Sequence, residues 1–353
     1  MFDHLPAAAQ AGIFLASAAI IWIAGVKLSG ATDILSVRFG FGQALGGVIL
    51  LAIATNLPEV AITASAAWHG DLGVAVGNIL GGIAIQTVVL VLLDAFGMKG
   101  EKAPLTYRAA SLTLVIEGLL VIAVLIVAVM ATQLPASLIV ARVTPDALLI
   151  ALLWGGGVWL IGRANRGLPW HDTTGRAPDT QEKPRGHSKE ARAKAAGATA
   201  VPVLIFAGGA VATLVAGVTI EESGSALASR IGMSGVAFGA TILAAATSLP
   251  EVSTGLASTR MKDYQLAISD IFGGNAFLPV LFLPATLLSG KAVLPHAADT
   301  DIYLTAVGIV LTLVYMAGLI FRPARRIARM GVDSLVVLAI YAAALAGLFA
   351  IAG

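Results

Sequence analysis

Two copies of one short acidic motif lie inside apolar stretches of this chain. ATNLPE ends at Glu59, and 192 residues later ATSLPE ends at Glu251. In a helix, each glutamate would lie one turn after a threonine, Thr55 or Thr247, so that a hydroxyl and a carboxylate share one face. Oxygen donors of this kind bind hard cations such as Na⁺ and Ca²⁺. The doubled motif therefore predicts cation chemistry.

A proline precedes the glutamate in each copy. Pro58 and Pro250 have no N–H, and their rings clash with the carbonyl four residues earlier. We therefore expect the carbonyl oxygens of Ala54 and Ala246 to lack helical partners. A helix broken in this way is tolerated in a membrane only where the freed backbone faces protein or a water-filled cavity. Freed carbonyl oxygens are further ligands for a hard cation.

An ionised glutamate in the middle of a membrane needs a compensating charge. Its burial there costs between about 2.5 and more than 10 kcal/mol. Neither motif segment contains a lysine or arginine near the glutamate, so a bound cation or a proton is the expected partner. An isolated glutamate could instead be protonated and hydrogen-bonded between helices. Two glutamates at equivalent repeat positions favour the cation.

A second pair of polar residues follows the two motifs. The segments AVGNILGG and AISDIFGG align and place Asn78 and Asp270 at equivalent positions, each before two glycines that permit close backbone approach. These segments offer oxygen ligands but no imidazole or thiol, which disfavours zinc and copper. Mg²⁺ is disfavoured because it gives up its waters reluctantly. The predicted cation site consists of Glu59, Glu251, Asp270, Asn78, Thr55 and Thr247.

Apolar segments long enough to cross a membrane must position these residues. Of the 353 residues, 58% are hydrophobic and 12% are charged, and the mean hydropathy is +0.91, which is typical of a polytopic membrane protein. Because a span needs about 20 apolar residues, we predict an all-α polytopic membrane protein with ten transmembrane helices. They are expected near residues 8–28, 42–67, 72–96, 109–130, 145–163, 199–220, 234–259, 264–290, 302–321 and 332–352.

Basic residues gather on one side of these predicted spans. Of the 22 lysines and arginines, all but Arg142, Arg230 and Lys291 belong to loops that follow odd-numbered spans. The positive-inside rule then predicts an inner (plasma) membrane protein with both termini outside the cytoplasm and the 164–198 loop within it. The N-terminus has no basic region of the signal-peptide type, so we expect the first span to be retained. The absence of cysteine excludes disulfides and thiolate sites.

The motifs belong to a longer internal repeat. A shift of 192 residues aligns 24–86 with 216–278 without a gap. Each half contains five predicted spans, an odd number, so the second must cross the membrane in the opposite direction. Such 5+5 inverted repeats are typical of transporters, with the binding site near the membrane midplane. The predicted parts are a first transmembrane half (1–163, repeat motif about 42–90), a cytoplasmic loop (164–198) and a second transmembrane half (199–353, repeat motif about 234–282).

The motif pair resembles the α-repeats of the cation/calcium exchanger superfamily, in particular the membrane region of sodium/calcium exchangers. Those repeats typically read G-T-S-x-P-E followed by G-[ND]-x-x-G-S-N. Here Asn56 stands where a serine is usual, and Ile83 replaces the amide that Asn275 keeps in the second copy. The resemblance covers both repeat motifs closely. It implies that Glu59 and Glu251 coordinate Ca²⁺ directly, and that overlapping Na⁺ and Ca²⁺ sites are completed by Thr55, Thr247, Asn78 and Asp270.

Antiport is the predicted function, with Ca²⁺ exchanged for Na⁺ by alternating access. Three acids in one cavity cannot stay both ionised and empty, so the carrier would change sides only when loaded. A cation/H⁺ antiporter, with Asp270 or a glutamate carrying the proton, is the alternative. The expected partners are inorganic cations and the lipid bilayer, with no cofactor, no nucleic acid and no obligatory protein partner.

Other functional classes fit the sequence less well. A membrane enzyme could use intramembrane carboxylates for acid and base chemistry, but no nucleophile or metal-ligand set accompanies them. The duplicated acids disfavour a scaffold, and a channel would show ungated flux far above carrier rates. Glu117 occurs once, so an interhelical hydrogen bond is favoured over a role in transport. Asp94, near a span end, is expected to be solvated, and Asp71 and Asp263 to cap the helices that follow them.

Overall fold

The computed structural model describes residues 2, 4–39, 46–109, 111–164, 167–169, 199–230 and 244–352. Within these ranges the chain is helical apart from connecting turns and short β-pairings. Most of the predicted 164–198 loop, and parts of the predicted spans 42–67 and 234–259, lie outside the described residues.

Seven helical segments of the described part are long and apolar enough to cross a membrane. The bent pair Ile49–Thr55 and Leu57–His69 forms an eighth if it is counted as one span, and the apolar helix Val332–Leu348 is shorter. The chain is thus a polytopic helical membrane protein, whereas ten spans remain a prediction. The seven segments are Ala7–Thr32, Leu72–Gly97, Leu112–Ala131, Pro145–Ala164, Ala200–Gly224, Tyr264–Ser289 and Asp299–Phe321.

The first half begins with a long helix, continues through a broken motif helix, and ends in two regular helices. Its elements are α1 (Ala7–Arg38), η1 (Gly46–Leu51), α3 (Ala52–Thr55), α4 (Leu57–His69), α5 (Leu72–Leu80), α6 (Ile83–Leu92), η2 (Leu93–Gly97), α7 (Leu105–Ala109), α8 (Leu112–Ala131) and α9 (Pro145–Ala164).

The second half follows the same order, and the bounds of α13 differ from those of α3 by the repeat shift of 192 residues. Its elements are α11 (Ala200–Arg230), α13 (Ala244–Thr247), α14 (Leu249–Arg260), α15 (Tyr264–Phe277), η5 (Leu278–Leu281), α16 (Phe282–Ser289), η6 (Leu294–His296), α17 (Asp299–Phe321), the antiparallel strands β1 (Arg326–Ile327) and β2 (Met330–Gly331), and α18 (Val332–Ala352).

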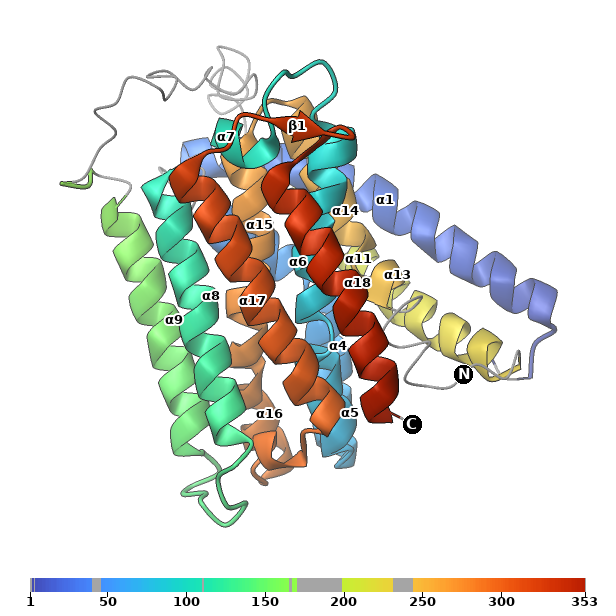
Figure 1. Cartoon of the computed structure of the whole chain (residues 1–353). Helices are drawn as coiled ribbons and strands as arrows, with labels where there is room; N and C mark the ends of the chain where they lie inside the picture. Colours follow the sequence, from blue (N-terminus) through green and yellow to red (C-terminus); the bar gives the residue numbers. More distant parts are fainter. Residues whose placement is uncertain are drawn as a thin grey trace.

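The two long helices cross the motif helices of opposite halves. In Figure 1, α8, α9, α17 and α18 stand upright, whereas α1 and α11 lie side by side and incline away from this bundle. A Cβ atom on Gly25 of α1 would lie 1.7 Å from the Ser253 hydroxyl oxygen, and one on Gly217 of α11 would lie 2.3 Å from Cγ of Pro58. Because Gly25 and Gly217 are equivalent repeat positions, both crossings depend on a missing side chain.

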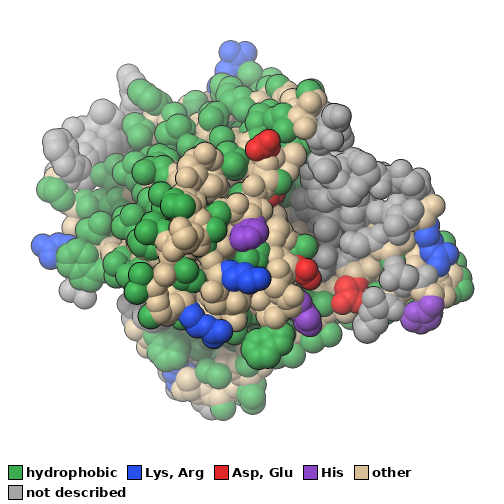
Figure 2. Space-filling model, turned by 90° about the horizontal axis from the view of Figure 1, so that it is seen from below, with side chains coloured by type: hydrophobic (Ala, Val, Ile, Leu, Met, Phe, Trp, Pro, Cys, Tyr) green, Lys and Arg blue, Asp and Glu red, His purple; other side chains and the backbone are tan. Residues whose placement is uncertain are grey.

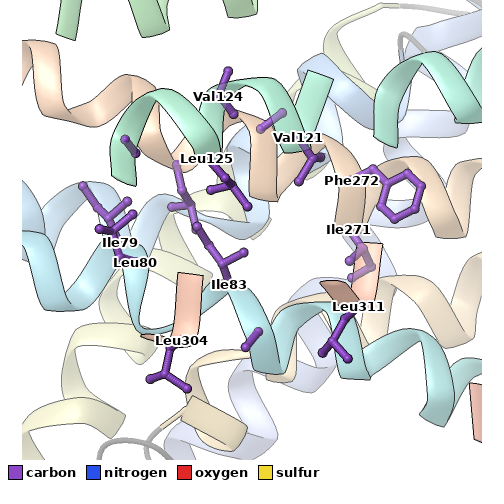
Figure 3. Close-up of a cluster of buried hydrophobic side chains, with 14 of the residues drawn as sticks. Ile79, Leu80, Ile83, Val121, Val124, Leu125, Ile271, Phe272, Leu304 and Leu311 are labelled. Atoms are coloured by element: carbon purple, nitrogen blue, oxygen red, sulfur yellow. The ribbon is translucent and has the colours of Figure 1, made fainter. Parts of the chain in front are cut away.

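A core of aliphatic side chains joins the halves. Figure 3 shows this cluster, in which buried residues of α5 and α6 meet those of α8, α15 and α17. Its labelled members are Ile79, Leu80, Ile83, Val121, Val124, Leu125, Ile271, Phe272, Leu304 and Leu311. The outside of the molecule is also apolar: Leu15 and Leu204 remain 67% and 69% exposed. Apolar side chains cover much of the face seen in Figure 2, with only scattered charges.

Several basic loops meet at one end of the molecule. The Arg326 guanidinium donates to the carbonyl oxygen of Glu101 at 2.7 Å, and Arg322 donates to that of Tyr107 at 3.1 Å. Lys262 lies 4.0 Å from the Glu101 carboxylate. The loops that follow the third, seventh and ninth predicted spans therefore share one side, as the charge pattern predicts. Which compartment faces that side remains a prediction.

Asp94 corrects one expectation. The sequence predicts a solvated side chain, but Asp94 is 1% exposed. Its carboxylate accepts hydrogen bonds from the Leu105 amide at 2.8 Å and the Ser334 hydroxyl at 2.8 Å, and also contacts the Gly331 amide. The β1–β2 hairpin and the start of α18 thus cover this carboxylate, and its role at the start of η2 is structural.

Candidate functional site

Each motif helix breaks immediately before its proline. The backbone leaves the helical conformation at Asn56 (φ −91°, ψ 14°) between α3 and α4, and at Ser248 (φ −83°, ψ 2°) between α13 and α14. Proline is tolerated in the first turn of a helix, where its missing N–H has no partner to lose. The first break bends the chain by 57°. The predicted interruptions are therefore confirmed.

The breaks place both motif glutamates in the first turn of a new helix. Glu59 and Glu251 are 3% and 1% exposed. The amide groups at a helix N-terminus carry partial positive charge, which favours an anionic side chain there. Thr55 ends α3 and is buried, and Thr247 ends α13 and is half-buried.

The three predicted acids are neighbours. Asp270, from α15, is fully buried, and the Glu251 carboxylate interacts electrostatically with both Glu59 and Asp270. Thr55, from the first half, also lies close enough to interact with Glu251. Glu59 lies 192 residues before Glu251 and 211 before Asp270 in the sequence, so their contact depends on the two halves folding their motifs onto a common region. The structure thus brings together Glu59, Glu251, Asp270 and Thr55.

Two threonine hydroxyls contact Asp270. The Thr254 hydroxyl lies 2.5 Å from Oδ2, and the Thr55 hydroxyl lies 3.4 Å from Oδ1. The Thr55 hydroxyl is nearer to the carbonyl oxygens of Leu51 and Ala52, at 3.1 and 3.3 Å. Thr254 is therefore the closer partner of this carboxylate, and Thr55 connects it to the break in the first motif.

Asn78 contacts the first motif helix through its amide nitrogen. Nδ2 donates to the carbonyl oxygen of Glu59 and to the Thr63 hydroxyl, both at 3.0 Å. These bonds do not use Oδ1, the atom that would bind a cation. The half-buried Asn78 thus ties α5 to α4 beside Glu59.

A layer of amides supports the break at Asn56. The Asn56 side chain donates to the carbonyl oxygen of Ala52 at 2.7 Å and accepts from Gln86 at 3.1 Å. A Cβ atom on Gly274 would lie 2.7 Å from the Asn56 amide nitrogen, so α15 approaches this residue closely. Asn56 thus has a structural role in holding the bend.

Three polar residues near the site are not among those that the sequence predicts: Thr63, Gln86 and Thr254. Two of them carry a signal that could have found them. Thr63 lies four residues after Glu59, and Thr254 lies three residues after Glu251, spacings that put each on the face of its motif glutamate. Gln86 carries no such local signal, because its partner Asn56 belongs to another helix.

The carboxylates do not by themselves form a metal cage. Within the described residues, no group of three or more histidine, aspartate or glutamate side chains is arranged to hold a metal ion. A bound cation would therefore draw part of its coordination from neutral oxygens. Thr55, Asn78 and the backbone at the helix breaks supply such oxygens, which are ligands that Ca²⁺ and Na⁺ accept.

Glu117 lies outside the doubled motif. This α8 residue is 1% exposed, and among the described residues neither of its oxygens accepts a hydrogen bond of normal geometry. The polar group that interacts with it is the Ser269 hydroxyl of α15. An interaction between helices is therefore present, in line with the structural role favoured by the sequence.

Comparison with known proteins places these features in a family. A family model described as "Sodium/calcium exchanger protein" matches residues 9–162 and 201–350. "Inner membrane protein YrbG" of Escherichia coli (strain K12) is 27% identical over 270 residues, covering 75% of this chain and 76% of the relative. "Putative antiporter CaxA" of Alkalimonas amylolytica is 28% identical over 286 residues, covering 80% and 82%.

Solved structures share the fold. The sodium-calcium exchanger NCX_Mj soaked with 100 mM Na⁺ and 10 mM Sr²⁺ superposes with a TM-score of 0.68 at 16% identity, over 97% of this chain and 99% of that one. The same exchanger soaked with 10 mM Na⁺ and zero Ca²⁺ gives a TM-score of 0.67 at 16% identity, with the same coverage. At this identity the likeness establishes the fold alone. Because the family model matches most of its length, the chain belongs to the sodium/calcium exchanger protein family.

Proposed function

We propose that this protein is a secondary antiporter that exchanges Ca²⁺ for Na⁺ by alternating access. The observation that carries the proposal is the burial of Glu59 and Glu251, one from each half, within electrostatic range of one another. Membership of the exchanger family supports the cation antiporter class. A relative is named as a putative antiporter, and the matched structures are of an exchanger soaked with Na⁺, Ca²⁺ or Sr²⁺.

The charges of the site favour a divalent ion. Two ionised glutamates together offset one Ca²⁺, and the fully buried Asp270 adds a further acidic group beside Glu251. Like charges at close range in a poorly solvated region repel strongly, so the empty site is unfavourable. Loading the site with Ca²⁺ or with Na⁺ would relieve this repulsion. Exchange requires that the carrier changes sides when it is loaded and stays in place when it is empty.

The proposed ligands are the six residues that the sequence predicts. Glu59 and Glu251 would bind Ca²⁺ directly, and Thr55, Thr247, Asn78 and Asp270 would complete overlapping Na⁺ and Ca²⁺ sites near the membrane midplane. Access would alternate as helices move around this fixed region. The α1–α11 pair is well placed for such movement, because it packs on both motif helices beside Pro58 and Ser253.

We further propose ten spans in a 5+5 inverted arrangement, with both termini outside the cytoplasm. The meeting of basic loops at one end of the molecule supports this orientation. Reporter fusions within residues 164–198 and after the last residue test it. An active cytoplasmic reporter in the loop and an active periplasmic one at the C-terminus are expected, and the reverse pattern would contradict the assignment.

Exchange with H⁺ is the second candidate. Asp270 is fully buried beside Glu251, so a proton could replace a sodium ion as the partner of this region. Proteoliposomes separate the two candidates. Ca²⁺ uptake driven by an outward Na⁺ gradient without a pH gradient supports Na⁺ coupling. Uptake driven by a pH gradient, and indifferent to added Na⁺, selects the H⁺ antiporter.

Substitution of the motif glutamates tests the site. Glu59→Gln and Glu251→Gln each remove one charge while keeping the size of the side chain. We expect either variant to abolish uptake of radioactive Ca²⁺ into inverted vesicles, because a buried ion left with an incomplete charge balance loses several kcal/mol. Elution of each variant as a monodisperse peak in size-exclusion chromatography controls for folding. Intact uptake in both variants would refute the assigned roles.

A further inference from the structure

A cavity opens between the two long helices, away from the proposed cation site. It has a volume of about 420 Å³. The helices run antiparallel there, since Arg230 near the end of α11 donates to the carbonyl oxygen of Leu5 at the start of α1. The residues that matter for its chemistry are Ile20, Ile23 and Lys27 of α1, and Leu204, Ile205 and Gly208 of α11. We call this cavity the α1–α11 groove.

A missing side chain keeps the groove open. No atom lies within 4 Å of the position that a Cβ atom on Gly208 would occupy. At the neighbouring Gly209, by contrast, a Cβ atom would lie 3.0 Å from Cγ of Leu28, so the helices touch at that position. The groove is therefore a gap beside a tight helix contact, and a larger residue at position 208 would project into it.

The groove lies on the exposed outer side of two candidate membrane spans. Both α1 and α11 contribute candidate spans, and only 28% and 33% of their apolar windows are buried. Ile23 and Leu204, which line the groove, are 63% and 69% exposed. An open apolar gap at this position in a bilayer borders lipid tails, because no other apolar material surrounds a membrane span. An acyl chain is thus the occupant that fits its walls.

One charged residue marks an end of the groove. Lys27 is exposed and has no ion-pair partner among the described residues. It lies five residues, or about 7.5 Å, before Thr32, the end of the span, at 1.5 Å of helix rise per residue. A lysine side chain extends towards the membrane surface while its stem stays in apolar surroundings. Its ammonium group can therefore reach the level of a lipid phosphate.

We propose that the α1–α11 groove binds one anionic phospholipid, with an acyl chain against Ile20, Ile23 and Gly208 and the headgroup phosphate at Lys27. A net negative headgroup is favoured, because basic residues between helices attract anionic lipids, whereas the cationic group of a zwitterionic lipid offsets the attraction. The bound lipid would hold α1 against α11. Since these helices pack on the motif helices beside Ser253 and Pro58, the lipid would stabilise the fold around the site.

Native mass spectrometry of the purified full-length chain in neutral detergent tests the proposal. Dioleoylphosphatidylglycerol and dioleoylphosphatidylcholine are added in turn, and bound lipid is counted. We expect one phosphatidylglycerol to bind at least fivefold more tightly than phosphatidylcholine. Lys27→Gln should weaken phosphatidylglycerol about fivefold and remove this preference. Gly208→Leu should abolish the binding of both lipids, because the leucine side chain fills the gap.

Two matched variants serve as controls. Lys291→Gln removes an exposed lysine away from the groove, and Gly12→Leu adds the same side chain to a glycine of α1, outside the groove, that has no atom within 4 Å of its Cβ position. Both should bind phosphatidylglycerol as the unaltered chain does. The proposal is overturned if Lys27→Gln keeps the preference for phosphatidylglycerol, or if folded Gly208→Leu binds it normally. A Gly208→Leu chain that does not fold leaves Lys27→Gln to decide.

Discussion

In the first half, Asn78 donates hydrogen bonds to the Glu59 carbonyl oxygen and the Thr63 hydroxyl, whereas its counterpart in the second half, Asp270, is contacted by the hydroxyls of Thr254 and Thr55. One residue is a half-buried donor and the other a fully buried acceptor. The backbone around them is repeated, but the polar chemistry is not. Negative charge is therefore concentrated on the second half, where Asp270 lies beside Glu251.

The two helix breaks also share their backbone bend but differ in the side chains around it. Asn56 stabilises the first break through Ala52 and Gln86, while the equivalent position of the second break is a serine, Ser248. The following turns also differ. Asp263 accepts a hydrogen bond from the Leu266 amide and caps α15, as predicted, whereas the prediction that the Asp71 side chain caps α5 is wrong, because it makes no such bond. The two halves thus share the helix bend and the motif glutamate, whereas the polar side chains around them differ.

Making the first half resemble the second should have the largest effect. Asn78→Asp removes both donated hydrogen bonds and adds a carboxylate beside Glu59. We expect Ca²⁺ transport in proteoliposomes to fall by about 100-fold, because the change combines lost bonds with like-charge repulsion. Asn78→Ser, which removes the amide without adding charge, is the matched control and should lose less. Equal losses in the two variants would show that charge at this position is unimportant.

Making the second half resemble the first should have a smaller effect. Asp270→Asn removes the acid that interacts with Glu251 but keeps its size. The expected loss of Ca²⁺ transport is about tenfold, because one charge–ion interaction is lost while both glutamates remain. Asp263→Asn, at a cap where asparagine serves equally well, should transport normally. Unchanged transport by Asp270→Asn would remove Asp270 from the proposed ligands.

The hydroxyl that contacts Asp270 is a third difference between the halves, and its removal should have a smaller effect still. The position equivalent to Thr254 in the first half is Ile62, so Thr254→Val gives the second half an apolar side chain there too. We expect about a fivefold loss of transport, because a hydrogen bond to a charged group is lost. Thr254→Ser retains the hydroxyl and should stay close to the unaltered protein. A similar loss in both variants would indicate a packing effect.

The unrepeated glutamate should matter least. Glu117→Gln places a neutral amide at a buried position where an ionised side chain without a charged partner is unfavourable. Transport should stay within about twofold of the unaltered protein, measured in the same vesicles. A loss as large as that of Glu59→Gln would assign Glu117 to the transport site and end the distinction between repeated and unrepeated acids.

Local rules were sufficient for the parts that depend on local chemistry. Proline at positions 58 and 250 predicted both helix breaks, and the charge pattern predicted that loops containing Lys262, Arg322 and Arg326 meet at one end. Apolar length located the seven helical segments that are long and apolar enough to cross a membrane. These features follow from a missing N–H, from the cost of moving charge through lipid, and from bilayer thickness.

Long-range contacts were beyond such rules. Asp94 was wrongly expected to be solvated, because the residues that cover it, Gly331 and Ser334, come from the far end of the chain. The pairing of Gln86 with Asn56 likewise depends on how two helices cross. In the candidate site, the repeat was sufficient to predict the three acids. The hydroxyl group of Thr254 that contacts Asp270 could not be predicted, because the contact depends on how α14 packs on α15.

A double-mutant cycle of Ca²⁺ binding tests the central claim most directly, namely that one glutamate from each half binds the same ion. Isothermal titration calorimetry would compare the unaltered protein with Glu59→Gln, Glu251→Gln and the double variant. Each single change should weaken binding about 100-fold, and the double variant should be less than about tenfold weaker than either, because both changes disrupt one shared ion. Losses that multiply in the double variant, or unaltered affinity in either single variant, would contradict the account.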